Sequence, residues 1–223
     1  MNFERSIAVL PPRPRPLLRF AVMGSRLLLP LLLSAAAVAG TGPFGVSEGL
    51  DRVEVEAIVG PLEEVGPSVL LATKFDSSFP ELESLSFFVS PQQGLCRIQA
   101  TSEVIPSDGR GRPLRDRFDR LLERLWEVYG HPEVIDRLSA GSAWAGEDAW
   151  MVALYERDRV LMTLWSEDQG SEVPAGVKRI VLSARALKPE EGFLSLDYFF
   201  SNWERCKSHF VDSPVLATPE PHP

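Results

Sequence analysis

Side chains that commonly perform acid–base or nucleophilic chemistry are sparse in this sequence. Of its three histidines, His209 and His222 lie in a proline-rich C-terminal stretch, so only His131 remains for a serine–histidine–acid relay. His131 follows the end of a predicted helix, a position that favours helix capping over catalysis. The sequence contains no glycine-rich phosphate loop, His-x-x-His pair or Gly-x-Ser-x-Gly elbow. We therefore expect no catalytic residue, no cofactor and no metal site.

Adjacent carboxylates are the other candidates for chemistry. Glu147 and Asp148 form one pair and Glu167 and Asp168 form another, each in a predicted loop. A glycosidase needs two carboxylates that face each other across the substrate, and adjacency in a loop does not supply that geometry. Paired acids in loops usually belong to a solvated surface. An envelope hydrolase with a carboxylate-based site is therefore the alternative function and not the favoured one.

Four tryptophans offer a possible binding face for a sugar or a peptide. Trp150, Trp165 and Trp203 fall in predicted strands, and Trp144 lies in the loop that precedes them. Aromatic residues on alternating strands also form core contacts and cross-strand pairs. Both interpretations remain open from the sequence, and this face is where we expect a ligand first.

The two cysteines, Cys96 and Cys206, predict one disulfide bond if the chain enters an oxidising compartment. Neither cysteine belongs to a Cys-x-x-Cys motif, and neither lies near histidines at zinc-ligand spacing. Two separately buried thiols are the alternative. A bridge would require the first group of predicted strands and the final hairpin to be neighbours.

The N-terminal residues predict export. Residues 1–22 are rich in proline and arginine and read as an extension from a mis-called start, with Met23 as the initiator. Residues 23–39 combine Arg26, an uncharged run and a small-x-small motif, which are typical of a signal peptide cut after Ala39. The uncharged run of 13 residues is shorter than a membrane-spanning helix needs, although an uncleaved anchor is the alternative. We expect a periplasmic or secreted protein.

Charge narrows the choice of partners. Cleavage after Ala39 leaves 18 basic and 30 acidic residues, a net charge of −12. Such a surface repels nucleic acid and anionic lipid headgroups, and no basic stripe offsets it. We therefore expect an unknown envelope protein or a cell-wall ligand as the partner, no nucleic acid, and no stable membrane insertion after cleavage.

The clearest structural signal is an amphipathic helix between Pro113 and Gly130. Its apolar residues recur with the period of a helix and are separated by charged residues of both signs. This apolar stripe comprises Leu114, Phe118, Leu121, Leu122, Leu125, Trp126 and Tyr129. Leu125 and Trp126 lie near its middle, so we expect both to be buried against a sheet.

Strand patterns flank this helix, and a shorter helix precedes them. The shorter helix is expected to begin with Ser47 as its cap and to end at Gly60. The predicted strands are residues 68–75, 82–90 and 95–104 before the long helix, and 150–155, 160–165, 177–187 and 193–203 after it. In the third strand, alternation places Cys96 on the buried face together with Ile98 and Ala100.

The element order is helix, three strands, helix, four strands. Short connections suit antiparallel pairing, which predicts an α+β fold with an antiparallel sheet of about seven strands covered by two helices. We expect a single domain over residues 44–206 and a disordered, proline-rich tail over residues 207–223.

Several segments carry a resemblance to known families. Residues 44–47, 59–61, 150–154, 159–161, Trp165 and 197–202 resemble an uncharacterised family of secreted bacterial proteins. The first segment also resembles the opening of β-lactamase-inhibitor-like and outer-membrane-assembly lipoprotein modules, in which a helix ending in Gly-Pro precedes an antiparallel sheet. The lipid-bearing cysteine of those lipoproteins is absent here. The resemblance implies secretion without an assigned activity, and the expected function is that of a non-catalytic binding or interaction module.

Overall fold

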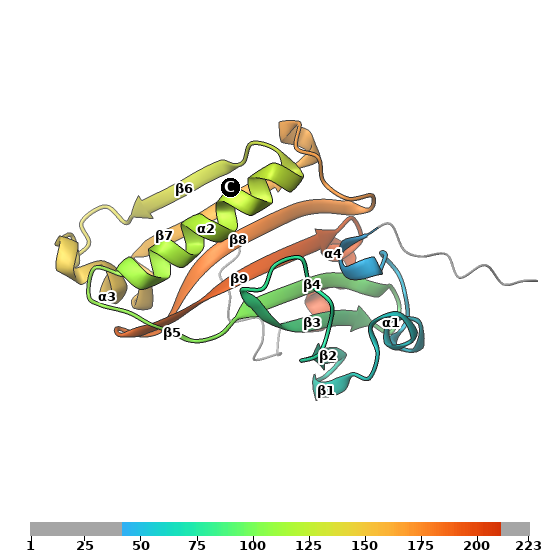
Figure 1. Cartoon of the computed structure of the whole chain (residues 1–223). Helices are drawn as coiled ribbons and strands as arrows, with labels where there is room; N and C mark the ends of the chain where they lie inside the picture. Colours follow the sequence, from blue (N-terminus) through green and yellow to red (C-terminus); the bar gives the residue numbers. More distant parts are fainter. Residues whose placement is uncertain (1–41, 211–223) are drawn as a thin grey trace, which may run out of the picture. The chain divides into compact units, whose positions relative to one another are not determined.

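The computed structural model describes residues 42–210, and all of them belong to one compact unit (Figure 1). The expected extension of residues 1–22, the signal peptide of residues 23–39 and residues 211–223 of the expected tail lie outside the described residues. None of the helices in the described part of the chain is long and apolar enough to cross a membrane.

All strands of residues 42–210 join a single antiparallel sheet of nine strands. The strands are β1 (Glu63–Gly66), β2 (Val69–Ala72), β3 (Leu82–Ser90), β4 (Gly94–Ser102), β5 (Ile105–Pro106), β6 (Glu133–Leu138), β7 (Arg159–Ser166), β8 (Val177–Lys188) and β9 (Glu191–Phe200). Their spatial order is β1-β2-β3-β4-β9-β8-β7-β6, and β5 pairs separately with β9. The pairing of β4 with β9 joins the first group of strands to the last, as a bridge between Cys96 and Cys206 requires.

Short and long helices accompany this sheet. The α-helices are α1 (Arg52–Val59), α2 (Arg112–Tyr129), α3 (Trp150–Tyr155) and α4 (Trp203–Cys206), and the 3₁₀ helices are η1 (Pro43–Gly45), η2 (Glu147–Ala149), η3 (Glu167–Gln169) and η4 (Lys207–Phe210). The predicted fold class, α+β with an antiparallel sheet, is confirmed. The predicted seven strands and two helices are wrong, because residues 42–210 form nine strands and four α-helices.

The two faces of the sheet differ in chemistry. The helix face is apolar and carries Leu85, Phe87, Ile98, Ala100, Leu182, Leu196 and Tyr198, which pack in one core with residues of α1, α2 and α3. The opposite face carries Ser86, Phe88, Arg97, Gln99, Val181, Ser183, Ser195, Asp197 and Phe199. At one end of the opposite face, Trp203 of α4 and Phe210 of η4 form a second apolar cluster with Phe88 and Phe199. The prediction of disorder is wrong for residues 207–210, because they form η4 and Phe210 is buried.

A β-bulge in β4 corrects the predicted position of Cys96. Phe88 lies opposite Arg97 while the next residue of β3, Val89, lies opposite Leu95, so Cys96 is an extra residue on β4. A bulge of this kind breaks the alternation of side chains between the two faces. Cys96 therefore joins the apolar cluster of the opposite face, and not Ile98 on the helix face.

Two further expectations fail because short segments carry ambiguous signals. Residues 150–155, predicted as a strand, form α3, and the buried side chains at positions 150, 151, 153 and 154 follow a helical spacing. A six-residue apolar run is too short for periodicity to separate helix from strand. Helix α1 is capped by Asp51 and not by Ser47: Asp51 accepts a hydrogen bond from the Glu54 N–H, and the Glu54 carboxylate accepts one from the Asp51 N–H, each at 2.9 Å.

Helix α2 matches its prediction except at one residue. It begins at Arg112, has Pro113 in its first turn and ends before Gly130, whose φ of 79° suits a glycine. Leu125 is fully buried, but Trp126 is 46% exposed, so the expectation that Trp126 is buried is wrong. The buried stripe is narrower than the apolar sequence pattern because successive residues point about 100° apart around a helix.

The neighbours Leu125 and Trp126 provide a matched test of this face. Leu125→Ala should lower the free energy of unfolding by about 2–5 kcal/mol, because it removes a fully buried side chain and leaves a cavity. Trp126→Ala should lower it by less than about 1 kcal/mol, because its side chain is half exposed. Urea unfolding of both variants measures these losses. A larger loss of unfolding free energy for Trp126→Ala than for Leu125→Ala would mean that Trp126, and not Leu125, is the core residue.

Two core tyrosines predict a loss of stability at alkaline pH. The hydroxyls of Tyr129 and Tyr198 lie 3.1 Å apart in the core. Burial raises the pKa of Tyr129 above its ordinary value and raises the pKa of Tyr198 well above it. Because both folded-state pKa values exceed the unfolded value of about 10, their contribution is fully present below pH 10 and is lost as the pH rises further. Unfolding free energy measured at about pH 9 and about pH 11 should fall more for the wild type than for the Tyr129→Phe/Tyr198→Phe variant; equal falls would contradict the assignment.

Candidate functional site

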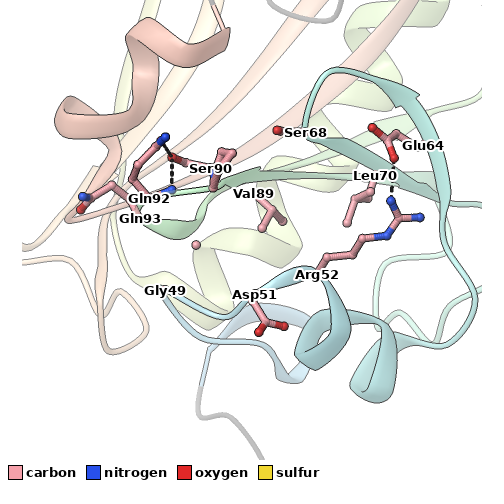
Figure 2. Close-up of a pocket in the computed structure, with 12 residues that line it drawn as sticks. Gly49, Asp51, Arg52, Glu64, Ser68, Leu70, Val89, Ser90, Gln92 and Gln93 are labelled. Carbon is pink, nitrogen blue, oxygen red and sulfur yellow. Dashed lines mark hydrogen bonds and ion pairs between the residues drawn. The ribbon is translucent and has the colours of Figure 1, made fainter.

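An open pocket of about 570 Å³ lies between the start of α1, strand β2 and the hairpin that joins β3 to β4 (Figure 2). Its lining is divided almost evenly between polar and apolar surface. The pocket is lined by Gly49, Asp51, Arg52, Glu64, Ser68, Leu70, Val89, Ser90, Pro91, Gln92, Gln93 and Gly94. Leu70 and Val89 supply apolar surface from β2 and β3, and the glutamines and the charged side chains supply most of its polar surface. No pattern in the sequence predicts this site.

The pocket depends on a close approach between two backbone segments. The Gly49 N–H donates to the Leu95 carbonyl at 2.9 Å, and the Leu95 N–H donates to the Leu50 carbonyl at 2.8 Å. A Cβ on Gly94 would lie 2.0 Å from the Gly49 carbonyl oxygen, and Gly94 has a φ of 65°. Only glycine satisfies both constraints at this position. The wall formed by the segment before α1 is therefore fixed to the hairpin by backbone bonds.

The carboxylates of the pocket are held apart by structural contacts. Asp51 caps α1 through its hydrogen bond from the Glu54 N–H. Glu64 of β1 accepts a 2.6 Å hydrogen bond from Arg52, and both side chains are about half exposed. Figure 2 shows the Asp51 side chain pointing away from the Arg52–Glu64 pair. The pocket thus lacks two carboxylates that converge on one point, which carboxylate-based hydrolysis requires.

The segment after β9 holds the other rim of the pocket. The Asn202 side-chain amide donates to the carbonyls of Gln93 and Leu95, at 3.1 and 3.0 Å. The Arg205 guanidinium donates to the Gln93 side-chain oxygen at 3.1 Å. These bonds fix the conformation of the hairpin turn that carries Gln92 and Gln93, so the mouth of the pocket is formed in advance of any ligand.

Ser68 and His209 meet at this rim, although the sequence placed His209 in the tail. The Ser68 hydroxyl lies 3.0 Å from His209 Nε2, and Ser68 has a φ of 61°. A hydroxyl beside an imidazole is the first requirement of an activated nucleophile, but the imidazole must also be oriented by a third group. Within residues 42–210, no carboxylate hydrogen-bonds to His209. The contact therefore does not form a relay, and of the two residues only Ser68 lines the pocket.

The four tryptophans do not form one binding face. Trp150 and Trp165 are buried in the core of the helix face, and the Trp165 indole N–H donates to the Gly130 carbonyl at 2.9 Å. Trp203 lies in the apolar cluster of the opposite face. Trp144 is 38% exposed in the loop after β6. The core interpretation of these residues therefore applies to three of them, and the structure does not bring Trp144 to the others.

The loop carboxylates and His131 also lie in structural surroundings. Asp148 accepts a hydrogen bond from Arg110 at 2.5 Å, and Asp168 pairs with Lys178 at 3.0 Å; all four side chains are substantially exposed. The His131 ring packs edge-on to Trp126, with centroids 4.4 Å apart. Within residues 42–210, no group of three or more histidine, cysteine or acidic residues is arranged to hold a metal ion.

A second polar cluster lies on the opposite face, where β4 meets β9. Arg97 donates to Asp197 at 2.6 Å, and both side chains are at most 3% exposed. Asp197 also accepts from the Ser195 hydroxyl at 2.8 Å, and Gln99 donates to that hydroxyl at 3.0 Å. Nearby, burial lowers the pKa of Arg185 below its ordinary value, although Asp197 favours its charged form. This cluster crosses the junction between the two groups of strands and stabilises their register.

Cys96 of β4 and Cys206 of α4 lie beside the junction between β4 and β9. Their sulfur atoms are 2.06 Å apart, the separation of a disulfide bond, and their Cα atoms are 6.7 Å apart. The pairing predicted from the sequence is therefore the pairing that the structure shows. The bridge fixes α4 against β4, and α4 in turn begins beside Asn202, which holds the pocket rim.

None of the protein-family models, curated proteins and solved structures that were compared with this chain matches it. Its function must therefore be inferred from the geometry of its own residues.

The approach of Gly94 to Gly49 provides a test of the pocket wall. Gly94→Ala should destabilise the protein through both its positive φ and the contact with the Gly49 carbonyl oxygen. Gly170→Ala is the matched control, because Gly170 also has a positive φ but a Cβ there would meet nothing within 4 Å. Denaturant unfolding should show a loss about 1–3 kcal/mol larger for Gly94→Ala. Equal losses would mean that the two segments separate easily.

Proposed function

We propose that this chain is a periplasmic or secreted, non-catalytic binding module whose ligand occupies the pocket between α1 and the β3–β4 hairpin. The observation that carries the proposal is a preformed, open pocket of about 570 Å³, a size within the usual range for ligand sites. Its walls are held by the Gly49–Leu95 backbone bonds and by Asn202. Preformed walls reduce the entropic cost of binding.

The lining of the pocket supports a ligand rich in hydrogen-bonding groups. Gln92 and Gln93 present side-chain amide groups, and the exposed Arg52–Glu64 pair adds one charge of each sign. These groups complement peptide amides and sugar hydroxyls better than an apolar molecule. We therefore infer a peptide or cell-wall glycan as the ligand class, displayed by an envelope protein or by the wall itself.

Export to the periplasm is part of this proposal. It is supported by the signal-peptide pattern of residues 23–39 and by the bonded pair of Cys96 and Cys206, because disulfides persist in oxidising compartments. The net charge of −12 after cleavage disfavours nucleic acid as a ligand.

The alternative function, an envelope hydrolase with a carboxylate-based site, is less well supported. Asp51 and Glu64 are engaged in separate contacts and do not converge. A non-catalytic module should also leave Ser68 unlabelled by a fluorophosphonate probe, since Ser68 and His209 lack a third, orienting group in the described residues. Labelling of Ser68 that disappears in a His209→Ala variant would overturn the non-catalytic proposal.

Filling the mouth of the pocket tests the binding site. Gln92 is exposed and accepts one hydrogen bond, from Ser90, so Gln92→Trp should place an indole in the mouth without disturbing the core. Isothermal titration of the full chain with soluble muropeptides, which contain both glycan and peptide, should show binding that Gln92→Trp weakens at least about tenfold, the effect of about 1.4 kcal/mol.

Gln169→Trp is the matched control, because Gln169 is also an exposed glutamine with one side-chain hydrogen bond, to Glu133. It should bind muropeptides as the wild type does. Equal binding by the wild type and Gln92→Trp would place the ligand elsewhere. Two negative results together would show that the pocket does not bind these ligands. The first is that the wild type binds no muropeptide. The second is that the wild type and Gln92→Trp capture the same envelope proteins.

A further inference from the structure

Strand β6 (Glu133–Leu138) forms one edge of the sheet, and its outer side has no neighbouring strand within residues 42–210 (Figure 1). Its inner side pairs with β7 over all six residues in an unbroken register. An edge strand exposes a row of backbone N–H and C=O groups to which another extended segment can add. This edge is therefore a potential site for the addition of a strand.

The other edge of the sheet is protected in ways that β6 is not. Strand β1 contains four residues, and its register with β2 shifts between Glu64 and Gly66. Short length and bulges are the usual devices that prevent edge-to-edge association, together with lysine and proline within the edge strand. Strand β6 has no bulge, no lysine and no proline between Glu133 and Leu138.

The side chains of β6 alternate between the two faces of the sheet. Glu133, Ile135 and Arg137 lie on the opposite face, since Ile135 pairs with Met162 and Met162 with Ser183. The helix face receives the other three residues of the strand. These are Val134, Asp136 and Leu138, and Val134 is 55% exposed. The strand thus presents an acid, an apolar residue and a base in succession on one face.

This pattern is self-complementary under two-fold symmetry. A two-fold axis normal to the sheet keeps each side chain on its own face, so a residue of one copy pairs only with a residue on the same face of the other copy. One residue of β6 must then lie opposite the same residue of the second copy, and the axis passes beside it. An axis at Asp136 sets two like charges opposite each other. An axis at Val134 sets Glu133 opposite Ile135. An axis at Ile135 sets Ile135 opposite itself and Glu133 opposite Arg137 on both sides. It also sets Val134 opposite Asp136, whose charge is already paired with Arg159 within its own chain.

We propose that β6 is a self-pairing edge, at which a second copy of this chain adds an antiparallel β6 strand with Ile135 opposite Ile135. The two symmetric Glu133–Arg137 pairs select this register, because opposite charges across a strand pair stabilise it and like charges destabilise it. Within residues 42–210, Arg137 is exposed and makes no ion pair, so its charge is available for the second copy. The pairing extends the sheet continuously across both copies.

The same register adds an apolar contact at each end of the paired strands. It sets Leu138 of one copy opposite Pro132 of the other, next to the ring pair of Trp126 and His131. Trp126 is 46% exposed, although it belongs to an amphipathic helix whose other large apolar side chains are mostly buried. Contact with the second copy covers part of this exposed ring. The proposal does not depend on the pocket or on its ligand.

Charge reversal on β6 tests the proposal through the oligomeric state of the full chain. Sedimentation velocity at about 1 to 200 µM and about 0.15 M salt should show a reversible dimer of the wild type. Arg137→Glu sets like charges opposite each other twice and should raise the dimer dissociation constant at least about tenfold. Arg120→Glu, at an exposed arginine of α2, is the matched control and should leave dimerisation unchanged.

Two compensating experiments separate self-pairing from a general effect of charge. The double variant Glu133→Arg/Arg137→Glu should dimerise again, because both pairs are restored with reversed polarity. The single variants Glu133→Arg and Arg137→Glu should each dimerise at least about tenfold more weakly than the wild type when alone, and they should associate with each other when mixed. Circular dichroism should show the same fold for all variants, since both positions are exposed.

Three results would overturn the proposal: a wild type that remains monomeric to about 200 µM, a dimer that Arg137→Glu leaves intact, or single variants that do not associate when mixed. The first shows that the edge does not pair at concentrations relevant to a dimer, and the other two place any dimer interface elsewhere.

Discussion

The antiparallel pairing of β4 with β9 is the contact on which the rest of the structure depends. It is the only place where the first four strands of the sheet meet the last four in the described part of the chain. The buried Arg97–Asp197 pair crosses it, and so does the hydrogen bond from Gln99 to Ser195. A shift of one residue in the register between β4 and β9 would turn the polar groups of one strand toward the helix face, into the apolar core. The buried ion pair therefore penalises a shift of register, because a shift would leave two buried charges unpaired.

The bulge at Cys96 connects this junction to the pocket. Because the bulge turns the thiol to the opposite face, Cys96 reaches Cys206 in α4, and the bridge closes a loop with a sequence separation of 110 residues. A loop of that length contributes about 4–5 kcal/mol in the chain-entropy model. The residue before α4, Asn202, then holds the carbonyls of Gln93 and Leu95. The rim of the pocket is thus positioned by the same contacts that join the two groups of strands.

Much of the fold could be predicted because long elements repeat their pattern many times. Helix α2 and strand β3 have nearly their predicted bounds, and the predicted bridge correctly required the first group of strands and the final hairpin to be neighbours, which they are through β4 and β9. Helix α3 and strand β6 were missed because six residues give too few repeats, and β6 is a charged edge that does not bury a full face. The bulge at Cys96 puts this side chain on the face opposite to the predicted one, and no local sequence pattern predicts the bulge.

The candidate site was less predictable than the fold for a physical reason. Its walls come from the segment before α1, from β1 and β2, and from the β3–β4 turn, which meet only after the sheet has formed. The one local signal is Gly94, a glycine at the end of a hairpin turn, but the sequence shows neither its φ nor the approach of Gly49. The tryptophans suggested a binding face that the structure does not form, because large aromatic side chains are common both in protein cores and in ligand sites. Only the residues that each tryptophan contacts distinguish a core position from a binding position.

The strand order also determines how two binding sites would be presented. The pocket involves β2 and β3, and β6 lies at the far end of the sheet from them. In two copies joined at β6, β3 and β2 lie five and six strand spacings from β6 and half a spacing more from the axis. The two pockets are therefore roughly 53–62 Å apart at about 4.8 Å per strand. Right-handed twist between successive strands also turns the two pockets in different directions. Such an arrangement suits two sites on an extended polymer, such as a cell-wall glycan, and not a single compact ligand, and it raises avidity only where the ligand can span that distance.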